Sequence, residues 1–453
     1  MTNTRSAKRV LVMGKDGRTD AIAAACVKSP SCAEIDAFAE LPIPGLIEKA
    51  RRLHLGSLTD LDRLREVVRI SQPDLVIVGP EDPLEAGVVD ALGELGVPAF
   101  GPSQRLAKIE SSKSWARGLL ERYDIPGNPQ QRLFEDGHDL ERYVDDLGAF
   151  VVKPDGLTAG KGVKVLGDHF LTAEEGLEYA RAVLLQSGRV QIEEKLEGQE
   201  FSLQTITDGV DVVHCPIVQD HKRAFEGDRG PNTGGMGSYS CADFALPFLE
   251  GTDVAAAQAI NERVIEALAS ETGERYKGVL YGGFMATRDG VALIEYNARF
   301  GDPEAMNVLP LLDADFVELC SAVAAGTLGS VPSAFMPKAT VCKYIVPAGY
   351  PDAPGEAEEI VVPSEYRDGD EVKWYWAASQ RRDDGRTYMS RSRAGAVVGI
   401  GDTLAAAERA AEDAAQAVVG PVRYRADIGR EDTIAARCDH MRRLRSRAPS
   451  HAG

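Results

Sequence analysis

The chain has little that would suit it to a membrane, a disulfide framework or a nucleic acid. No apolar run approaches the length of a membrane span. Its seven cysteines are scattered without a CxxC pair, which excludes a disulfide framework and a structural zinc site. Basic residues are in deficit, since 51 Lys and Arg face 70 Asp and Glu, and the formal charge of −19 repels nucleic-acid and membrane phosphates. We therefore expect a cytoplasmic protein that contacts neither nucleic acid nor membrane.

Apolar residues, in contrast, are plentiful enough for several domains. They make up 44% of the 453 residues, which favours two to four packed units. Buried-strand patterns at residues 9–14, 73–79 and 97–101 alternate with helical patterns such as residues 83–95. This alternation predicts an open parallel α/β domain over residues 1–104.

The rest of the chain differs in character. A helix is expected over residues 103–123, and strand patterns then alternate with glycine-rich loops, the first strand at residues 150–154. This pattern predicts an α+β unit with a nucleotide-sized cleft over residues 105–335. A small mixed α/β domain is expected over residues 336–430, and residues 431–453 are expected to form a basic, frayed tail.

The most specific motif is the loop KPDGLTAGKGV, which lies between two predicted strands. Its glycines let backbone N–H groups approach phosphate oxygens, while Lys153 and Lys161 supply positive charge. It is not a Walker A loop, because Gly156 and Gly160 are one residue too close, Gly162 follows the lysine, and a strand follows instead of a helix. The motif predicts a mobile flap over a triphosphate. An ordinary glycine hairpin with surface lysines is the alternative.

A second motif, LIEYNARFGDPE, combines a strand with a polar turn. Residues two apart on a strand share a face, so Glu295 and Asn297 can offer oxygen ligands to Mg²⁺. Arg299 continues this alternation and could bind a transferring phosphoryl group or a carboxylate. A half-exposed strand with polar residues on its wet face is the alternative. The Gly-Asp-Pro-Glu turn that contains Asp302 favours the functional interpretation.

A third group of motifs, QDHKR and GPNTGGMG, combines charged side chains with a glycine-rich backbone. Cationic side chains and flexible backbone donors are typical of an anion site. A solvated loop is the alternative. The residues expected to bind substrate here are Asp220, Lys222, Arg223, Asn232, Thr233 and Gly234.

The segment VQIEEKLEGQE could form the strand and hinge of an adenine pocket. Glu193 and the backbone near Leu196 could meet the purine edge, and Glu200 could bind ribose hydroxyls. An edge strand that carries acidic residues is equally consistent with this segment.

Taken together, these motifs resemble those of the ATP-grasp ligases, most closely the phosphoribosylamine–glycine ligase family. The likeness is strongest over residues 70–350, and so many matches in order are hard to obtain by chance. The motifs that carry it are GPEDPL from Gly79, ESSK from Glu110, the Lys153 loop, IEE from Ile192, DHKR from Asp220, GPNTGGMG from Gly230 and EYNARFGDPE from Glu295.

The resemblance implies an ATP-grasp domain at residues 105–335, with a flexible lid at about 126–195. It implies that Lys113 and Lys153 contact the phosphates of ATP and that the glycine loop folds over them. The implied ATP-binding residues are Lys113, Lys153, Gly156, Gly160, Lys161, Gly162, Glu193, Glu194, Leu196 and Glu200.

The implied activity joins glycine to phosphoribosylamine through an acyl phosphate, with ATP and Mg²⁺ or Mn²⁺ as cofactors. Lys153, Arg299 and Asp302 would be catalytic, and Glu295 with Asn297 would hold the metal. A monomer or weak homodimer is expected. The implied substrate-binding residues are Gly17, Arg18, Asp220, Lys222, Arg223, Asn232, Thr233 and Gly234.

Some positions depart from the family pattern. The first loop, GKDGRTD from Gly14, lacks a glycine, a glutamate and a histidine, so its phosphate-binding capacity would depend on Gly17, Arg18 and the helix N-terminus that follows. Two alternatives therefore stay open. One is a related ATP-grasp carboxylate–amine ligase that uses another amine, and the other is an ATP-binding protein without turnover.

Overall fold

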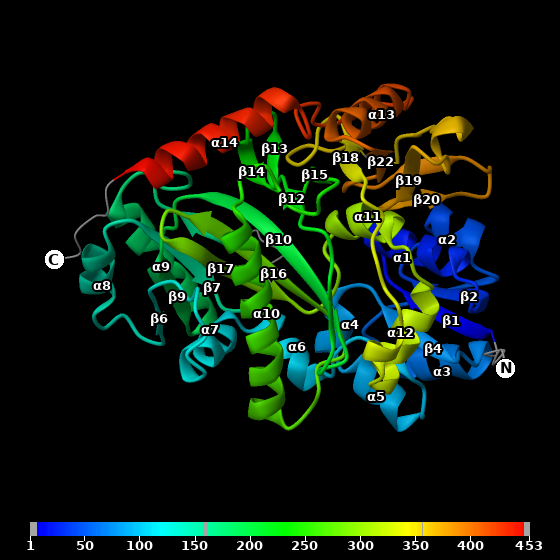
Figure 1. Ribbon diagram of the computed structural model, residues 1–453, viewed down its shortest axis with the longest axis horizontal. Helices are drawn as coiled ribbons and strands as arrows, with labels where there is room; N and C mark the ends of the chain where they lie inside the picture. Colours follow the sequence, from blue (N-terminus) through cyan, green and yellow to red (C-terminus); the bar gives the residue numbers. More distant parts are fainter. Residues whose placement is uncertain (1–6, 157–161, 356, 448–453) are drawn as a thin grey trace.

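The computed structural model describes residues 7–156, 162–355 and 357–447 (Figure 1). Within these ranges, no helix combines the length and the apolar character that a bilayer span needs. The chain passes from a parallel α/β layer at the N-terminus through two antiparallel sheets to a third antiparallel sheet in the C-terminal part. The predicted fold class, α/β and α+β with several domains, is confirmed.

The N-terminal sheet is parallel, with the described strands in the order β3-β2-β1-β4-β5. All four residues of β4 are buried, as are the last four of β1, which explains their uninterrupted apolar sequence. The chain order reverses between β1 and β4, so the loops after these two strands meet at one edge, where α/β folds bind ligands. The elements are β1 Lys8–Met13, α1 Gly17–Lys28, β2 Cys32–Ala39, α2 Pro44–Lys49, β3 Arg52–Leu55, α3 Leu61–Ser71, β4 Leu75–Val78, α4 Glu81–Glu85, α5 Val88–Glu94 and β5 Ala99–Phe100.

Two helices predicted as continuous are interrupted in the structure. The helix expected over residues 83–95 is α4 and α5, because Gly87 adopts a φ of 84° between them. The helix expected over residues 103–123 is α6, Gln104–Ser111, and α7, Lys113–Arg122. Ser112 is extended, and its hydroxyl accepts a hydrogen bond from the backbone N–H of Trp115, which caps α7. Lys113 is therefore the first residue of a helix.

The central part of the chain contains two antiparallel four-stranded sheets in its described residues. The sheet β6-β9-β7-β8, with α8 and α9, has an apolar core of its own around Phe150, Ile192 and Leu177. The sheet β11-β10-β16-β17 packs against α10. The elements are β6 Gln131–Phe134, α8 Leu140–Leu147, β7 Phe150–Pro154, β8 Lys164–Val165, α9 Ala173–Ser187, β9 Val190–Glu194, β10 Gln199–Thr207, β11 Val212–His214, β12 Gln219–Asp220, β13 Arg223–Phe225, β14 Arg229–Asn232, β15 Gly237–Ser240, α10 Gly251–Thr272, β16 Gly278–Thr287, β17 Gly290–Asn297, α11 Glu304–Val308, η1 Leu309–Leu311, α12 Phe316–Ala325 and η2 Leu328–Ser330.

The C-terminal sheet incorporates strands from the central part of the chain. Its order is β12-β15-β18-β22-β19, so β12 and β15, which flank the predicted substrate loops, are continuous with it. This pairing fixes the substrate loops to the C-terminal domain. The remaining elements are β18 Ala339–Pro347, η3 Ser364–Tyr366, β19 Val372–Trp376, β20 Ser379–Arg381, β21 Thr387–Met389, β22 Gly395–Gly401, α13 Leu404–Gln416, β23 Val422–Arg423 and α14 Glu431–Ser446.

The end of the chain is helical where it is described, so the prediction of a frayed tail is wrong for residues 431–446. Helix α14 buries Ile434, Met441 and Leu444 in the main apolar core. These positions recur at helical spacing, which places them on one face. In Figure 1, α14 crosses from the C-terminal domain over β13 and β14 toward the sheet that contains β7 and β9.

Candidate active site

A cleft of about 980 Å³ lies where the three parts of the chain meet. It is lined by the ends of the N-terminal strands, by β7 and β9, by β17 and by the loops that follow β12 and β14. The sequence-predicted residues that line it are Arg18, Lys113, Lys153, Glu193, Glu194, Leu196, Glu200, Asp220, Lys222, Arg223, Asn232, Thr233, Gly234, Glu295, Asn297, Arg299 and Asp302.

Five predicted residues stand apart from this lining. Gly17 packs internally, since a Cβ atom there would lie 2.5 Å from the hydroxyl of Tyr344. Gly156 and Gly162 are not part of the cleft wall, although the Nζ of Lys113 donates to the carbonyl of Gly156 at 2.6 Å. The two others, Gly160 and Lys161, lie outside the described residues.

The residues Arg117, Lys153 and Glu193 form a buried charge cluster, here called the lid cluster. The Nζ of Lys153 on β7 donates to Glu193 on β9 at 2.6 Å. Arg117 of α7 donates to both oxygens of Glu193 at 2.8 Å. Burial alone would raise the pKa of Glu193, but the charges of Arg117 and Lys153 lower it to about 2. Both carboxylate oxygens of Glu193 are therefore occupied by cations of the chain itself.

Strand β17 passes beside the lid cluster and presents the predicted metal ligands. Lys153 donates to the carbonyl of Ile294 at 3.2 Å, and Arg117 donates to the same carbonyl at 2.8 Å. Burial would raise the pKa of Glu295, yet the charges of Lys222 and Lys153 hold it below its ordinary value. Glu295 therefore lines the cleft as a carboxylate.

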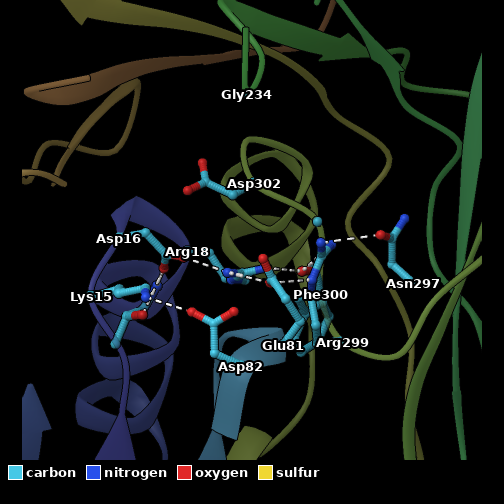
Figure 2. A network of polar contacts seen from close by, with 12 residues as sticks. Lys15, Asp16, Arg18, Glu81, Asp82, Gly234, Asn297, Arg299, Phe300 and Asp302 are labelled. Carbon is cyan, nitrogen blue, oxygen red and sulfur yellow. Dashed lines mark hydrogen bonds and ion pairs between the residues drawn. The ribbon is translucent and has the colours of Figure 1, made fainter. Parts of the chain in front are cut away.

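A second, largely buried cluster, the Arg299 cluster, consists of Arg299, Glu81 and Glu110. Figure 2 shows Arg299 and Glu81 side by side. The guanidinium of Arg299 pairs with Glu81 at 3.0 Å and with Glu110 at 2.8 Å, and it donates to the Oδ1 of Asn297 at 3.1 Å. Against the effect of burial, Arg299 and Arg18 lower the pKa of Glu81 to about 2. Burial raises the pKa of Glu110 to about 7. The two acids that hold one guanidinium therefore titrate in different pH ranges.

The first loop of the chain joins this cluster through Arg18. Its guanidinium donates to the carbonyl of Phe300 at 2.7 Å and to the carboxylate of Asp16, and it lies 3.6 Å from Glu81. Asp16 also caps α1 by accepting from the backbone N–H of Thr19 at 3.0 Å. Figure 2 shows the side chain of Arg18 between Asp16, at the start of α1, and Glu81, the first residue of α4. The carboxylate of Asp16 therefore occupies the helix N-terminus that was predicted to receive a phosphate.

The predicted substrate loops are fastened to the Asp302 turn by Arg393 of the C-terminal domain. The Nη1 of Arg393 donates to the carbonyls of Gly234 at 2.6 Å and Gly235 at 3.0 Å, and its Nη2 lies 3.3 Å from Asp302. Tyr344 donates to the other oxygen of Asp302 at 2.5 Å, and Arg393 lies over its ring. The Gly-rich loop and the Asp302 turn are thus held together at one end of the cleft.

Asp220 faces the same end of the cleft with one free oxygen. The residue is half-buried, and its Oδ1 atom is buried without a hydrogen-bond partner among the described residues. Burial raises the pKa of Asp220 well above its ordinary value, and the nearby Glu304 adds to this effect. Next to it, Lys222 pairs with Glu200 at 3.2 Å. An acceptor and a cation therefore lie side by side where a polar substrate could bind.

Among the cleft residues to which sequence reasoning assigned no role are Glu110, Arg117 and Arg437. Arg117 follows Lys113 by one helical turn on α7, and this spacing was a usable signal. Glu110 was part of a recognised motif, but its contact with Arg299 bridges 189 positions of sequence. Arg437 comes from the C-terminal end of the chain, where no local pattern indicates that it reaches the cleft.

Family models match most of the chain in three consecutive segments. They are described as the N domain, the ATP-grasp (A) domain and the C domain of phosphoribosylglycinamide synthetase, and they match residues 8–110, 111–305 and 340–431. The chain belongs to the phosphoribosylglycinamide synthetase family. The predicted resemblance is thereby confirmed, and so is the assignment to the ATP-grasp ligases.

Relatives of phosphoribosylglycinamide synthetase match over their full length. The phosphoribosylamine–glycine ligase of Methanosarcina barkeri is 44% identical over 437 residues, which cover 96% of this chain and 100% of the relative. The crystal structure of phosphoribosylamine–glycine ligase from Thermotoga maritima superposes with a TM-score of 0.77 at 26% identity, over 92% of this chain and 99% of that one.

The fold is also shared with a more distant group. The biotin carboxylase domain of the Hydrogenobacter thermophilus 2-oxoglutarate carboxylase, solved with MgADP, has a TM-score of 0.70 at 15% identity. The match covers 97% of this chain and 94% of that domain. At this identity the likeness shows a shared fold.

Proposed function

We propose that the chain ligates glycine to phosphoribosylamine at the expense of ATP and forms glycinamide ribonucleotide, ADP and phosphate. The observation that carries this proposal is the single cleft that brings the lid cluster, β17 and the substrate loops together. Full-length relatives with this activity at 44% identity support it. A role in purine biosynthesis, which the family resemblance implies, agrees with these relatives.

The reaction would proceed in two steps. An oxygen of the glycine carboxylate attacks the γ-phosphorus of ATP, the bond from that phosphorus to the bridging oxygen breaks, and ADP leaves. The positive charges of Lys153 and Arg299 stabilise the negative charge that develops on the transferred group. The amine of phosphoribosylamine then attacks the carbonyl carbon of the acyl phosphate, loses a proton and displaces phosphate.

The contacts of Glu193 in the lid cluster favour a different role from the predicted contact with the purine edge. Its carboxylate is fully engaged by Lys153 and Arg117, so it cannot also read the purine edge without breaking a buried ion pair. We infer that Glu193 positions Lys153 toward the phosphates. The purine edge would then meet the backbone near Glu194 and Leu196, and the ribose would meet Glu200, all of which line the cleft.

A divalent cation, Mg²⁺ or Mn²⁺, would be held by Glu295 and Asn297. The donor set fits, because an ionised carboxylate and an amide oxygen are hard ligands of the kind that Mg²⁺ prefers. The described residues hold no group of three or more acidic, His or Cys side chains that could bind a metal alone. Phosphate oxygens and water would complete the coordination, as is common for Mg²⁺ in phosphoryl-transfer sites. When bound, the ion would neutralise phosphate charge.

The lid and the substrate loops complete the proposal. Residues 126–195 would close over the triphosphate through the Gly156 to Gly162 loop and so protect the acyl phosphate from water. Asp302 would orient the reacting groups, and the amine and its phosphate would be held by the previously named loop residues Gly17, Arg18, Asp220, Lys222, Arg223, Asn232, Thr233 and Gly234. Gly17 has no side chain and would act through its backbone, and Tyr344 leaves no room for a side chain at this position.

Two further expectations accompany the activity. All seven cysteines are free thiols in the structure, which is consistent with the proposed cytoplasmic location. The expected oligomeric state, a monomer or weak homodimer, stays a prediction that light scattering on a size-exclusion column can test.

The decisive experiment measures ADP release with a panel of carboxylates and amines, including glycine with freshly generated phosphoribosylamine. The proposal expects turnover only when both of these substrates are present. Turnover with glycine and a different amine would favour a related carboxylate–amine ligase. Nucleotide binding without turnover for any pair would identify a non-catalytic ATP-binding protein and would overturn the proposal.

A further inference from the structure

Helix α14 brings a buried arginine to the cleft from a part of the chain to which the family models assign nothing. Their match ends at residue 431, where α14 begins. Arg437 of this helix lines the cleft, and its side chain is only 15% exposed. A cation so deeply placed needs partners, and those partners show what α14 does.

The guanidinium of Arg437 bridges two functional segments. Its Nη1 donates to the Oε1 of Gln199 at 2.8 Å, and its Nη2 donates to Asp228 at 2.7 Å. Gln199 begins β10 directly before Glu200, the residue proposed to bind ribose. Asp228 lies in the turn between β13 and β14, the hairpin that carries Arg223 and ends at Asn232.

The two partners of Arg437 are themselves held by the C-terminal part of the chain. The side-chain amide of Gln199 also contacts the ring Nδ1 of His440, one turn further along α14, at 2.8 Å. The second oxygen of Asp228 accepts from Arg425 at 2.8 Å. Burial would raise the pKa of Asp228, but His221, Arg437 and Arg425 lower it to about 2. Asp228 is thus a permanent anion between two arginines.

The corner beneath Arg437 contains an imidazole without protein partners. His221 is 2% exposed and lines the cleft, and neither of its ring nitrogens has a hydrogen-bond partner among the described residues. Burial, and after it the positive charge of Arg437, lower the pKa of His221 to about 3, so the ring is neutral at physiological pH. The buried Nε of Arg437 has no partner among the same residues. Hydrogen-bonding capacity in this corner is therefore left unused by the described protein groups.

We propose that Arg437 is a positioning residue that couples the nucleotide hinge at Gln199 to the substrate hairpin at Asp228. This inference rests on the proposed function. A single guanidinium fork holds both segments, so its loss would release the Glu200 side of the cleft and the hairpin together. Arg299 pairs with Glu81, Glu110 and Asn297, and none of these residues belongs to α14. The Arg299 side of the cleft, which could bind the carboxylate of glycine, would therefore be spared.

The test compares Arg437→Ala with the wild type in steady-state assays of ATP and glycine. The KM for ATP is expected to rise about tenfold, as for the loss of two charge-assisted hydrogen bonds that act through a neighbouring residue. The KM for glycine is expected to change less than about twofold. Arg437→Lys keeps the charge but cannot form the fork, so its KM for ATP should lie between the two.

The matched control is Arg442→Ala on the same helix. Arg442 is 76% exposed and pairs only locally, with Asp439 at 2.9 Å, so this variant should keep wild-type values of both KM and melting temperature. If Arg437→Ala does not fold, Arg437→Lys takes its place. A lower melting temperature of Arg437→Ala with an unchanged KM for ATP would show that Arg437 only stabilises the fold, and it would overturn the inference.

A second measurement separates this inference from the proposed function. Equilibrium binding of ADP needs no ligation, and Arg437→Ala should bind ADP about tenfold more weakly than the wild type. An inactive wild type would remove the proposed function but leave this comparison intact. Equal ADP affinity of the variant and the wild type would overturn the role of Arg437, whatever the wild type catalyses.

Discussion

The lid cluster and the Arg299 cluster both flank β17, yet they balance their charges in opposite ways. In the lid cluster one carboxylate, Glu193, lies between two cations, and its pKa is about 2. In the Arg299 cluster one guanidinium lies between two carboxylates, of which Glu81 has a pKa of about 2 and Glu110 of about 7.

This difference separates a fixed part of the cleft from a part that responds to pH. In the lid cluster, the carboxylate of Glu193 stays ionised around neutral pH, because its pKa is about 2. The Arg299 cluster gains a negative charge near neutrality when Glu110 ionises. We infer that the carboxylate of the lid cluster keeps its charge near neutral pH, whereas the charge of the Arg299 cluster varies with the ionisation of Glu110.

The largest effect is expected on β17, between the two clusters. Glu295→Ala and Asn297→Ala should each lower kcat for ADP formation by at least about a thousandfold, because each removes a proposed metal ligand. The melting temperature should fall only slightly, because Glu295 is half-buried and its removal leaves the apolar core intact, although nearby cations favour its charge. Retained turnover in both variants would remove the metal assignment. The control is Thr287→Ala, which lies at the turn of the β16–β17 hairpin, away from Glu295 and Asn297.

The next largest loss of stability and activity is expected when the lid cluster is broken. Glu193→Ala leaves Lys153 and Arg117 buried without their shared anion, which should cost about 3–5 kcal/mol in the free energy of unfolding. Activity should fall about a hundredfold in the protein that remains folded, because Lys153 loses its orientation. Urea unfolding and ADP release measure the two effects. The exposed Glu121→Ala on α7 is the control, and equal stability of both variants would refute a structural role for Glu193.

The elements that could be predicted from the sequence are those whose pattern is local. The strand at residues 150–154 and helix α12 follow from uninterrupted apolar or helical periodicity. Strand β2 was missed because Glu34 and Asp36 interrupt its apolar pattern, although Asp36 is buried against Arg51. Helix α14 was taken for a tail because its many basic residues conceal a narrow apolar stripe.

The candidate site was predictable only where its residues follow one another in a motif. Glu295, Asn297 and Arg299 share one strand and its continuation, so their spacing was sufficient. The partners of these residues come from distant segments, as when Arg117 reaches Glu193 across 76 positions. Charge compensation of this kind depends on tertiary packing, and a single sequence does not reveal it.

A smaller effect, the pH dependence of stability caused by Glu110, tests the contrast between the two clusters. The folded-state pKa of Glu110, about 7, lies above its ordinary value of 4.5, so between these values the folded protein keeps a proton that the unfolded chain has released. Stability should therefore fall as pH rises through this window, on the order of 2–3 kcal/mol in total. Glu110→Gln should remove this fall and lower kcat by about tenfold, because Arg299 keeps a neutral partner. Urea unfolding at about pH 5 and about pH 8 tests this.

Glu193→Gln is the natural comparison for this pH test. Its parent carboxylate stays ionised throughout the window, so the variant should lose stability equally at both pH values. A pH-independent stability of the wild type over this window would contradict the assignment of a raised pKa to Glu110. It would also remove the contrast between the two clusters.

The smallest effect is expected for a pair at the edge of the Arg299 cluster. Lys15 pairs with Asp82 at 2.7 Å, but both side chains are more than a third exposed, so solvent screens their attraction (Figure 2). Lys15→Ala should change the free energy of unfolding by less than about 0.5 kcal/mol, and added salt should shrink the difference. Because Lys15 does not line the cleft, the KM for the amine should change less than about twofold. A large rise in that KM would instead extend the substrate site to the first loop, and the buried clusters would no longer account for binding on their own.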